Sequence, residues 1–319
     1  MKILFSAPTQ FLDLIKLQKS SPFEINFHEI RTQKEIFELR NKEEFYGWVV
    51  NPCPEFIIDE SILDLFQNMR VITTPSTGKS HIELSATTKR DIVVRGLLES
   101  NVVSSITASS EFTFMLCLNA VRKARSSFRA VIDGHWRDME HELRGREIRE
   151  LTVGIIGFGR IGCNLKKYFD SMGAKVVVFD TDPSKTKELD RENCGTVDQI
   201  LAQSDIVITP VTLSETNERM ANAQFFSKMK QGSIFINTSR GDVVDEVALL
   251  RALESGKLSA CALDVLSSEN KPNFLNDNPL VKYSQNNDNL ILTPHMAGLT
   301  FDSEIKAQTA ALKLLLEVM

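Results

Sequence analysis

Several features that mark whole classes of proteins are absent from this sequence. No stretch approaches the roughly 18 apolar residues that a membrane span needs, and the longest apolar run, 112–121, is broken by Thr113 and Asn119. The five cysteines lie far apart and form no C-x-x-C pair, a pattern typical of free thiols in a reducing compartment. The N-terminal stretch 1–8 has one basic residue and its apolar run is cut short by Pro8, so it predicts a strand rather than a signal peptide. We therefore expect a cytoplasmic protein without a membrane partner.

An excess of positive charge is absent as well. Lys and Arg number 37 against 42 Asp and Glu, so the formal net charge is −5, and attraction to nucleic acid or to an anionic membrane is not expected. Internal repeats and low-complexity tracts are missing, and the hydrophobic (42%) and charged (25%) fractions are those of an ordinary globular protein. No metal site is predicted. The length of 319 residues indicates two domains or one large one.

Short β-rich runs alternate with helical patterns in two series along the chain. This alternation predicts βαβ units and parallel sheets, that is, an α/β fold. The first series has predicted strands at 2–5, 48–50, 71–73 and 92–94 and helices at 60–68 and 82–89. A long helix is predicted at 101–130, with an apolar middle that should be buried between two layers. The second series has predicted strands at 153–157, 175–180, 206–209, 233–237, 260–264 and 290–293.

A run dense in charge, residues 137–150, separates the two series. Two interpretations remain open from the residues alone. The run is either a solvated linker or an arm that forms a dimer.

A glycine-rich turn opens the second series. The strand at 153–157 leads into G-x-G-x-x-G, formed by Gly157, Gly159 and Gly162, and a helical pattern and a second strand ending in Asp180 follow. In this context the first glycine permits a tight turn, the second lets a pyrophosphate approach the backbone, and the third lets the helix pack on the strand. Asp180 lies 18 residues past Gly162, where a carboxylate can accept hydrogen bonds from ribose hydroxyls. A Gly-rich turn alone is common, but strand, glycines, helix and acidic residue in this order predict a dinucleotide site.

Asp180 also predicts which dinucleotide binds. A 2′-phosphate would be repelled by this carboxylate, and residues 181–183 contain no Arg or Lys to offset it. NAD is therefore expected in preference to NADP. The alternative for Asp180 is a solvated turn residue before Pro183.

Three later strands end close to residues suited to hydride-transfer chemistry: Arg240, Asp264 with Glu269 in the next loop, and His295. Ligands of open parallel sheets bind beyond the carboxyl ends of the strands. Reduction of a ketone needs a cation near the substrate and a proton donor, which His can supply near neutral pH, and a carboxylate can orient that His. Taken singly, His295 could be a hydrogen-bonded turn residue, Arg240 a strand cap and Glu269 an ordinary loop residue. Their joint occurrence after a dinucleotide turn favours catalysis.

At these motifs the chain resembles the D-isomer-specific 2-hydroxyacid dehydrogenase family, in a phosphoglycerate dehydrogenase-like form without a C-terminal regulatory domain. The resemblance extends over nearly the whole chain. The matching segments are 154–162, 237–241, 263–265 with Glu269, and 293–298, and upstream 76–84 and 110–113.

The resemblance implies a role for each matching residue. Arg240 would bind the substrate carboxylate and carbonyl, His295 would be the acid–base group, and Glu269 would pair with it. The implied cofactor-binding residues are Gly157, Gly159, Arg160, Ile161, Gly162, Asp180, Thr209, Pro210, Thr238, Asp264 and Gly298. Backbone amides of Thr77, Gly78 and Lys79 would grip the substrate carboxylate, and His81 would be structural.

The resemblance also implies an architecture and a function. Two Rossmann-like doubly wound domains are expected, with an NAD-binding domain (99–290) inserted into a flavodoxin-like substrate domain (1–98 plus 291–319), and a homodimer. The implied activity is NAD-dependent interconversion of a small D-2-hydroxy acid and its 2-oxo acid. The loop 51–54 has no Arg, which phosphoglycerate dehydrogenases tend to place there for the substrate phosphate. The alternatives are an NAD-sensing, corepressor-like protein and formate oxidation, although formate enzymes typically pair the His with Gln rather than Glu.

Overall fold

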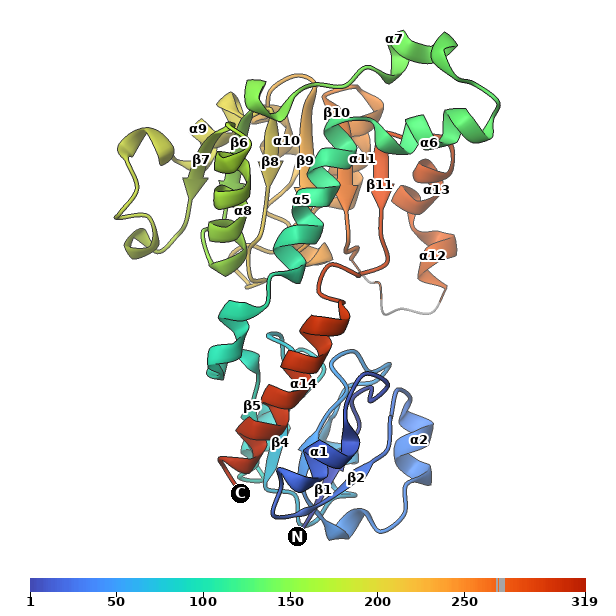
Figure 1. The fold of residues 1–319 in the computed structure, drawn as a ribbon, viewed down its shortest axis with the longest axis vertical. Helices are drawn as coiled ribbons and strands as arrows, with labels where there is room; N and C mark the ends of the chain where they lie inside the picture. Colours follow the sequence, from blue (N-terminus) through green and yellow to red (C-terminus); the bar gives the residue numbers. More distant parts are fainter. Residues whose placement is uncertain (268, 270–272) are drawn as a thin grey trace. The chain divides into compact units, whose positions relative to one another are not determined.

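The chain folds into two compact α/β units. The computed structural model describes residues 1–267, 269 and 273–319 (Figure 1). Unit 1 comprises Met1–Ile106 and Leu299–Met319, and unit 2 comprises Thr107–Gly298. The second unit is therefore inserted into the chain of the first.

Unit 1 is built on a five-stranded parallel sheet with the strand order β2-β1-β3-β4-β5, which is the flavodoxin-like order. Alternate residues of β1 point to opposite faces, so Leu4 lies in one hydrophobic cluster and Ile3 and Phe5 in another. Trp48 stacks on Phe66 on the first face. The strands are β1 (Lys2–Phe5), β2 (Glu24–Phe27), β3 (Phe45–Val49), β4 (Val71–Thr73) and β5 (Val93–Arg95).

Helices cover both faces of this sheet. The last helix of the chain packs on β3 and β4, and its Ala311, Leu312 and Leu315 join the cluster around Phe5. The helices are α1 (Leu14–Lys19), α2 (Gln33–Glu38), α3 (Glu60–Leu63), α4 (Leu84–Thr88) and α14 (Phe301–Leu316).

Unit 2 has a six-stranded parallel sheet with the order β11-β10-β9-β8-β6-β7. An isolated parallel bridge from Val178 to Cys194 adds the trace of a further strand outside β7, which completes the Rossmann order. The order reverses between β6 and β8, so the crevice for a ligand is expected at their carboxyl ends. The strands are β6 (Thr152–Ile156), β7 (Lys175–Phe179), β8 (Ile206–Ile208), β9 (Ser233–Asn237), β10 (Leu258–Leu263) and β11 (Leu290–Leu292).

The strands of unit 2 are apolar on both faces because helices cover both. Leu116 of α5 and Leu165 and Phe169 of α8 pack on one face, and Ile200 of α9, Phe226 of α10 and residues of α11 pack on the other (Figure 1). The helices are α5 (Ala108–Val121), α6 (Ala124–Ile132), α7 (Glu140–Leu143), α8 (Arg160–Ser171), α9 (Val197–Gln203), α10 (Ala223–Lys228), α11 (Glu246–Glu254), α12 (Phe274–Asp277) and α13 (Pro279–Asn286).

The prediction of one long helix at 101–130 is wrong. The segment is a 3-10 turn at Asn101–Ser105 followed by α5 and α6, and the break between the helices lies at Lys123, whose φ of 49° is left-handed. The apolar middle is also not buried all round, because Met115 is 40% exposed. The edge strand β2 escaped prediction, since only Ile25 of its four residues is buried.

Both predicted domain boundaries, after residues 98 and 290, lie eight residues before the observed ones, after 106 and 298. At the first boundary, 3-10 turns at Leu97–Glu99 and Asn101–Ser105 pack against α14 and so remain with unit 1. At the second, β11 pairs with β10 and so remains with unit 2.

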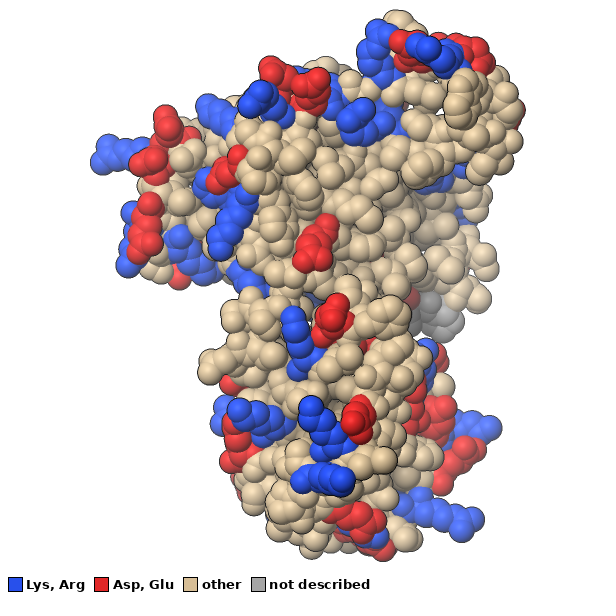
Figure 2. All heavy atoms as spheres, in the orientation of Figure 1, with Lys and Arg blue, Asp and Glu red and all other residues tan. Residues whose placement is uncertain are grey.

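The surface and the cysteines carry little that is unusual. On the face drawn in Figure 2, acidic and basic side chains lie interspersed, and both signs gather around α7. Cys117, Cys163, Cys194 and Cys261 are free thiols. Within the described ranges, no helix combines the length and apolar character needed to cross the bilayer, and no cluster of three or more metal-ligating side chains occurs.

Candidate active site

The three glycines of the turn after β6 each have a separate structural reason. Gly157 has a φ of 109°, and a Cβ there would lie 2.8 Å from the side chain of Val211. A Cβ on Gly162 would lie 2.2 Å from the carbonyl oxygen of Gly157, so only glycine lets α8 pack this closely. A Cβ on Gly159 would meet nothing within 4 Å, so the backbone there faces open space.

This turn fits a dinucleotide phosphate. Gly159 is the N-cap of α8, and no side chain of the described residues caps the helix there. The N-terminus of α8, which begins with Arg160 and Ile161, therefore presents its positive dipole end toward the open surface beside Gly159. The open space at Gly159 is what a pyrophosphate needs to approach the backbone.

The carboxyl end of β8 lies beside this turn. The carbonyl oxygen of Pro210 would lie 3.0 Å from a Cβ on Gly157, and Thr209 is fully buried. The backbone N–H of Thr209 donates to the carbonyl of Ile236 at 3.2 Å. The structure thus brings the predicted residues 209 and 210 to the point where the strand order reverses.

Asp180 follows β7 and is held close to the glycine turn. Its Oδ2 accepts a hydrogen bond from the backbone N–H of Phe158 at 2.7 Å, and its Oδ1 accepts one from the N–H of Asp182 at 2.9 Å. Burial raises the pKa of the Asp180 carboxyl, but the two backbone N–H donors and Lys185 outweigh burial and leave this pKa below its usual value.

Residues 181–183 supply no cation to Asp180, but Lys185 does. Lys185 Nζ lies 3.1 Å from Oδ1 and 3.3 Å from Oδ2 of Asp180, whose side chain is only 7% exposed. Lys185 lies just beyond the stretch 181–183, and a tight turn brings it back to Asp180. The Asp-Pro pair at 182–183 is a turn signal that could have revealed this contact.

His295 and Glu269 form a close pair after β11 and β10. His295 Nδ1 lies 2.6 Å from Glu269 Oε1. His295 has a left-handed φ of 55°, and its backbone N–H donates to the carbonyl oxygens of Asp264 at 2.8 Å and Thr293 at 3.0 Å. A non-glycine residue held in this conformation by its surroundings is a common feature of functional sites.

The charges around His295 favour its protonated form. The hydrogen bond to Glu269 is the largest cause and raises the pKa of His295, burial and the Arg240 guanidinium oppose it, and the net direction is upward. Arg240 lies three residues after the end of β9, and its charge acts on the ring of His295. The structure therefore brings together the three predicted catalytic residues.

The side chain of Asp264 holds the loop that carries His295 through hydrogen bonds. It is 1% exposed, its Oδ1 accepts hydrogen bonds from Thr293 Oγ1 (2.5 Å) and the N–H of Met296 (2.8 Å), and its Oδ2 accepts one from the N–H of Ala297 (2.7 Å). Contact of Asp264 with the nicotinamide amide stays a prediction.

Two further predicted cofactor residues lie against α5. Thr238 Oγ1 lies 2.6 Å from Thr113 Oγ1, and a Cβ on Gly298 would lie 3.8 Å from Ser109 Oγ. The contact of Thr113 with Thr238 was not foreseen from the sequence, in which they lie far apart.

In unit 1 the predicted substrate loop, Thr77 to Lys79, follows β4 and is held by polar contacts. Ser76 Oγ donates to the carbonyl of Gly78 at 2.6 Å. Lys79 Nζ forms an ion pair with Glu99 Oε1 at 2.6 Å, a contact that sequence reasoning missed.

His81 lies just beyond this loop. Its Nε2 is 3.0 Å from Thr74 Oγ1, and burial lowers the pKa of His81 to about 4. His81 is therefore neutral near pH 7, in keeping with a structural role.

Comparison with protein families gives a match over most of unit 2. The family described as "D-isomer specific 2-hydroxyacid dehydrogenase, NAD binding domain" matches residues 114–297. A D-3-phosphoglycerate dehydrogenase of Archaeoglobus fulgidus is 30% identical over 96% of this chain, and this chain spans 55% of that protein's length. A glyoxylate reductase of Thermofilum pendens is 32% identical over 82% of this chain and 75% of its own length.

Solved structures resemble the whole chain. A D-lactate dehydrogenase from Aquifex aeolicus, solved with NAD and lactic acid, has a TM-score of 0.79 and 26% identity, and the match covers 98% of this chain and 94% of that one. A D-2-hydroxyisocaproate dehydrogenase has a TM-score of 0.85 over 99% of this chain and 96% of its own, and at 23% identity it speaks for the fold alone.

Proposed function

The chain belongs to the D-isomer specific 2-hydroxyacid dehydrogenase family, whose NAD-binding domain matches residues 114–297, and from this premise we propose its reaction. The protein interconverts a small D-2-hydroxy acid and its 2-oxo acid, with NAD as the hydride carrier. The observation that carries the proposal is the 2.6 Å pair of His295 and Glu269, within electrostatic range of Arg240. An acid–base group, its orienting carboxylate and a substrate-binding cation are what this reaction requires.

Each of these side chains has a defined task. When bound, the nicotinamide supplies or accepts the hydride. Glu269 occupies Nδ1 of His295 and so directs Nε2 toward the substrate oxygen, to which the imidazolium gives its proton during reduction. Arg240 binds the substrate carboxylate and carbonyl through its planar guanidinium. Binding of a carboxylate by the backbone amides of residues 77–79 in unit 1 stays a prediction.

A panel assay tests this proposal. NADH oxidation is measured against unphosphorylated 2-oxo acids of increasing side-chain size and against a phosphorylated one, and NADH binding is measured separately by fluorescence. We expect turnover of at least one unphosphorylated acid, since loop 51–54 carries no Arg for a phosphate. NADH binding without turnover of any acid would point instead to an NAD-sensing protein.

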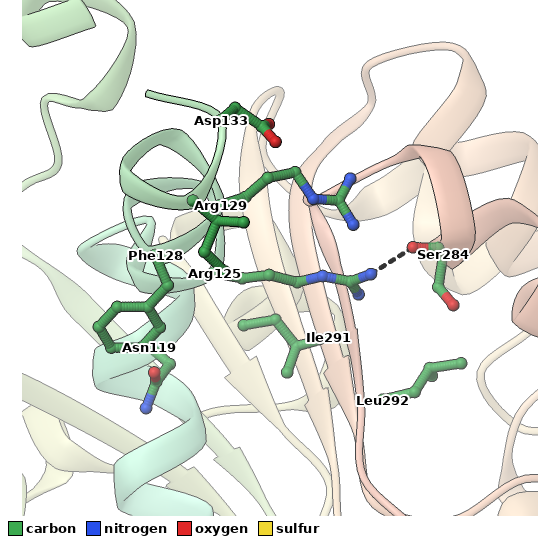
Figure 3. Close-up of a pocket in the computed structure, with 9 residues that line it drawn as sticks. Asn119, Arg125, Phe128, Arg129, Asp133, Ser284, Ile291 and Leu292 are labelled. Carbon is green, nitrogen blue, oxygen red and sulfur yellow. Dashed lines mark hydrogen bonds between the residues drawn. The ribbon is translucent and has the colours of Figure 1, made fainter. Parts of the chain in front are cut away.

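We also propose that unit 2 forms a homodimer through α6 and the segment that follows it. Phe128, Ile132 and Trp136 are 68%, 84% and 75% exposed, which is costly for large apolar side chains in a monomer. Phe128 and Ile132 line a groove of about 530 Å³ beside α13 and β11 (Figure 3). The groove is lined by Asn119, Arg125, Phe128, Arg129, Ile132, Asp133, Ser284, Ile291 and Leu292.

Two arginines that line this groove are held by contacts with the loop before β11 and with α13. Arg125 and Arg129 both form ion pairs with Asp288 Oδ1, at 3.3 Å and 3.1 Å, and Arg125 also donates to the carbonyl of Ser284 (Figure 3). Sedimentation equilibrium of Ile132→Glu tests the dimer, with the exposed Ile15→Glu in unit 1 as the control. We expect monomers only for Ile132→Glu, and a monomeric wild type would contradict the proposal.

We place the protein in the cytoplasm. The support is its cysteine chemistry, because Cys117, Cys163, Cys194 and Cys261 are free thiols and two of them, Cys117 and Cys261, are fully buried. Fractionation of cells with a marker enzyme for each compartment tests this localisation.

A further inference from the structure

The turn after β7 brings Lys185 close to Asp180, the acidic residue expected to set the cofactor preference. Asp182 caps the 3-10 turn Pro183–Lys185, because its Oδ1 accepts hydrogen bonds from the backbone N–H of Ser184 at 3.0 Å and from Ser184 Oγ at 2.6 Å. The N–H of Lys185 donates to the carbonyl of Asp182 at 3.2 Å. This tight turn reverses the chain, so Lys185 Nζ reaches both oxygens of Asp180.

A second lysine lies in the same neighbourhood. Burial raises the pKa of the Cys163 thiol in the first turn of α8, the Lys167 and Lys185 ammonium groups oppose that rise, and Asp180 adds to it. The charges of Lys167, Asp180 and Lys185 therefore all act on this thiol. The negative charge of Asp182 opposes the positive charge of the lysines, although Asp182 Oδ1 already accepts two hydrogen bonds from Ser184.

Lys185 occupies acceptor sites of Asp180 that a ribose would use. Each oxygen of Asp180 already accepts one backbone hydrogen bond, from Phe158 or Asp182, so the lysine takes remaining lone pairs. The hydroxyls of an adenosine ribose must compete with the ammonium group for them. A 2′-phosphate would instead attract the ammonium group and relieve part of its repulsion from Asp180.

We propose that Lys185 is a second specificity-determining residue for the cofactor, which weakens the preference for NAD over NADP that Asp180 alone would impose. The inference rests on the proposed function in that it takes a nicotinamide dinucleotide as the ligand. Lys185 is 44% exposed on its side chain, so solvent screens its charge, and the effect is moderate. The ratio of the NADPH and NADH dissociation constants should change by roughly three- to tenfold when Lys185 loses its charge.

Direct binding measures this ratio without turnover. NADH and NADPH are titrated by fluorescence into the wild type, Lys185→Met and Lys187→Met, and the fragments 5′-ADP and 2′,5′-ADP are titrated by calorimetry. Lys187→Met is the matched control, because Lys187 is an exposed lysine two residues further on. We expect Lys185→Met to bind NADPH and 2′,5′-ADP more weakly and NADH at least as tightly, while Lys187→Met keeps the wild-type ratio.

A double-mutant cycle with Asp180→Ala separates the two residues. Removing Asp180 should relax the preference for NAD. In that background Lys185→Met should no longer improve NADH binding, because the carboxylate whose oxygens Lys185 occupied is gone. The proposal would be overturned if the ratio of the NADPH to the NADH dissociation constant in Lys185→Met were equal to or smaller than that of the wild type. It would also be overturned if Lys187→Met changed this ratio by the same factor. Failure of the 2-oxo acid panel would overturn the proposed reaction alone, since these titrations contain no substrate.

Discussion

Two histidines, one in a loop of each unit, show how the hydrogen-bond partner of a residue decides its role. His81 follows β4 in unit 1 and contacts a hydroxyl, Thr74 Oγ1, at 3.0 Å. His295 follows β11 in unit 2 and contacts a carboxylate, Glu269 Oε1, at 2.6 Å. Burial lowers the pKa of the first to about 4, whereas the hydrogen bond to Glu269 raises the pKa of the second.

The difference separates structural from catalytic use of the same side chain. A hydroxyl offers no charge to offset desolvation, so His81 stays neutral and serves as a half-buried hydrogen-bonding residue. A carboxylate stabilises the imidazolium, so His295 can hold the proton that reduction of a ketone consumes. The type of loop does not distinguish the two residues, because both follow parallel strands.

Removal of His295 is the strongest way to break this comparison. We expect His295→Ala to lose about 10²–10⁴-fold in kcat/KM for 2-oxo acid reduction, the usual contribution of a general acid, and to bind NADH with unchanged affinity. His81→Gln, which keeps a hydrogen-bonding group near Thr74, should lose far less. Steady-state kinetics with fluorescence titration of NADH measure both effects, and equal losses in the two variants would refute the comparison.

Arg240 tests the same site from the substrate side. Arg240→Ala should cost on the order of 2–5 kcal/mol of transition-state stabilisation, because a charge-assisted contact to a buried carboxylate is lost. The charge of Arg240 also lowers the pKa of His295, so the reductive pH limb of the residual activity should move to higher pH. The variant's kcat/KM and NADH affinity are measured over pH. Full activity on every accepted acid would show that another residue binds the substrate.

The sequence predicts those parts of the fold and site that depend on local order. The strand, three glycines, helix and Asp180 follow one another along the chain, and the structure has them in that arrangement. The short edge strand β2 was missed because a strand with one buried residue leaves almost no periodic signal. The break at Lys123 was missed because a lysine is an ordinary helix residue and its left-handed φ is set by packing.

Contacts between residues far apart in the sequence were the second kind of feature that the sequence alone could not predict. The pairing of His295 with Glu269 came from the resemblance to a family, since no spacing rule joins residues that lie 26 apart in two different loops. The ion pair of Lys79 with Glu99, 20 residues apart, had no such guide. Lys185 was missed although it is near in sequence, because its contact with Asp180 depends on the geometry of the turn between them.

The loss of folding stability at acid pH reports the protonation of His81. Its folded-state pKa of about 4 lies below the unfolded value of about 6.5, so the unfolded chain binds the proton first and stability is lost as pH falls from about 6.5 toward 4. Between pH 7 and pH 5 this loss is about 2 kcal/mol. Urea unfolding at both pH values should show a smaller decline in His81→Gln than in the wild type. Equal declines would mean that His81 is not the group that titrates.

The variant Glu269→Gln changes the structure least and tests the role of His295 directly. Glu269→Gln keeps the size of the side chain and one hydrogen bond but removes the charge that raises the pKa of His295. Reduction needs the imidazolium, so it fades as pH rises through that pKa, whereas oxidation needs the neutral ring and shows the opposite limb. In Glu269→Gln the pKa of His295 should fall, and the reductive limb of kcat/KM should move to lower pH. The imidazole resonances, followed by NMR over the same pH range, report the titration of His295 independently of turnover. If the two pH profiles superimpose, the carboxylate of Glu269 does not set the protonation of His295, and the contrast with His81 needs another cause.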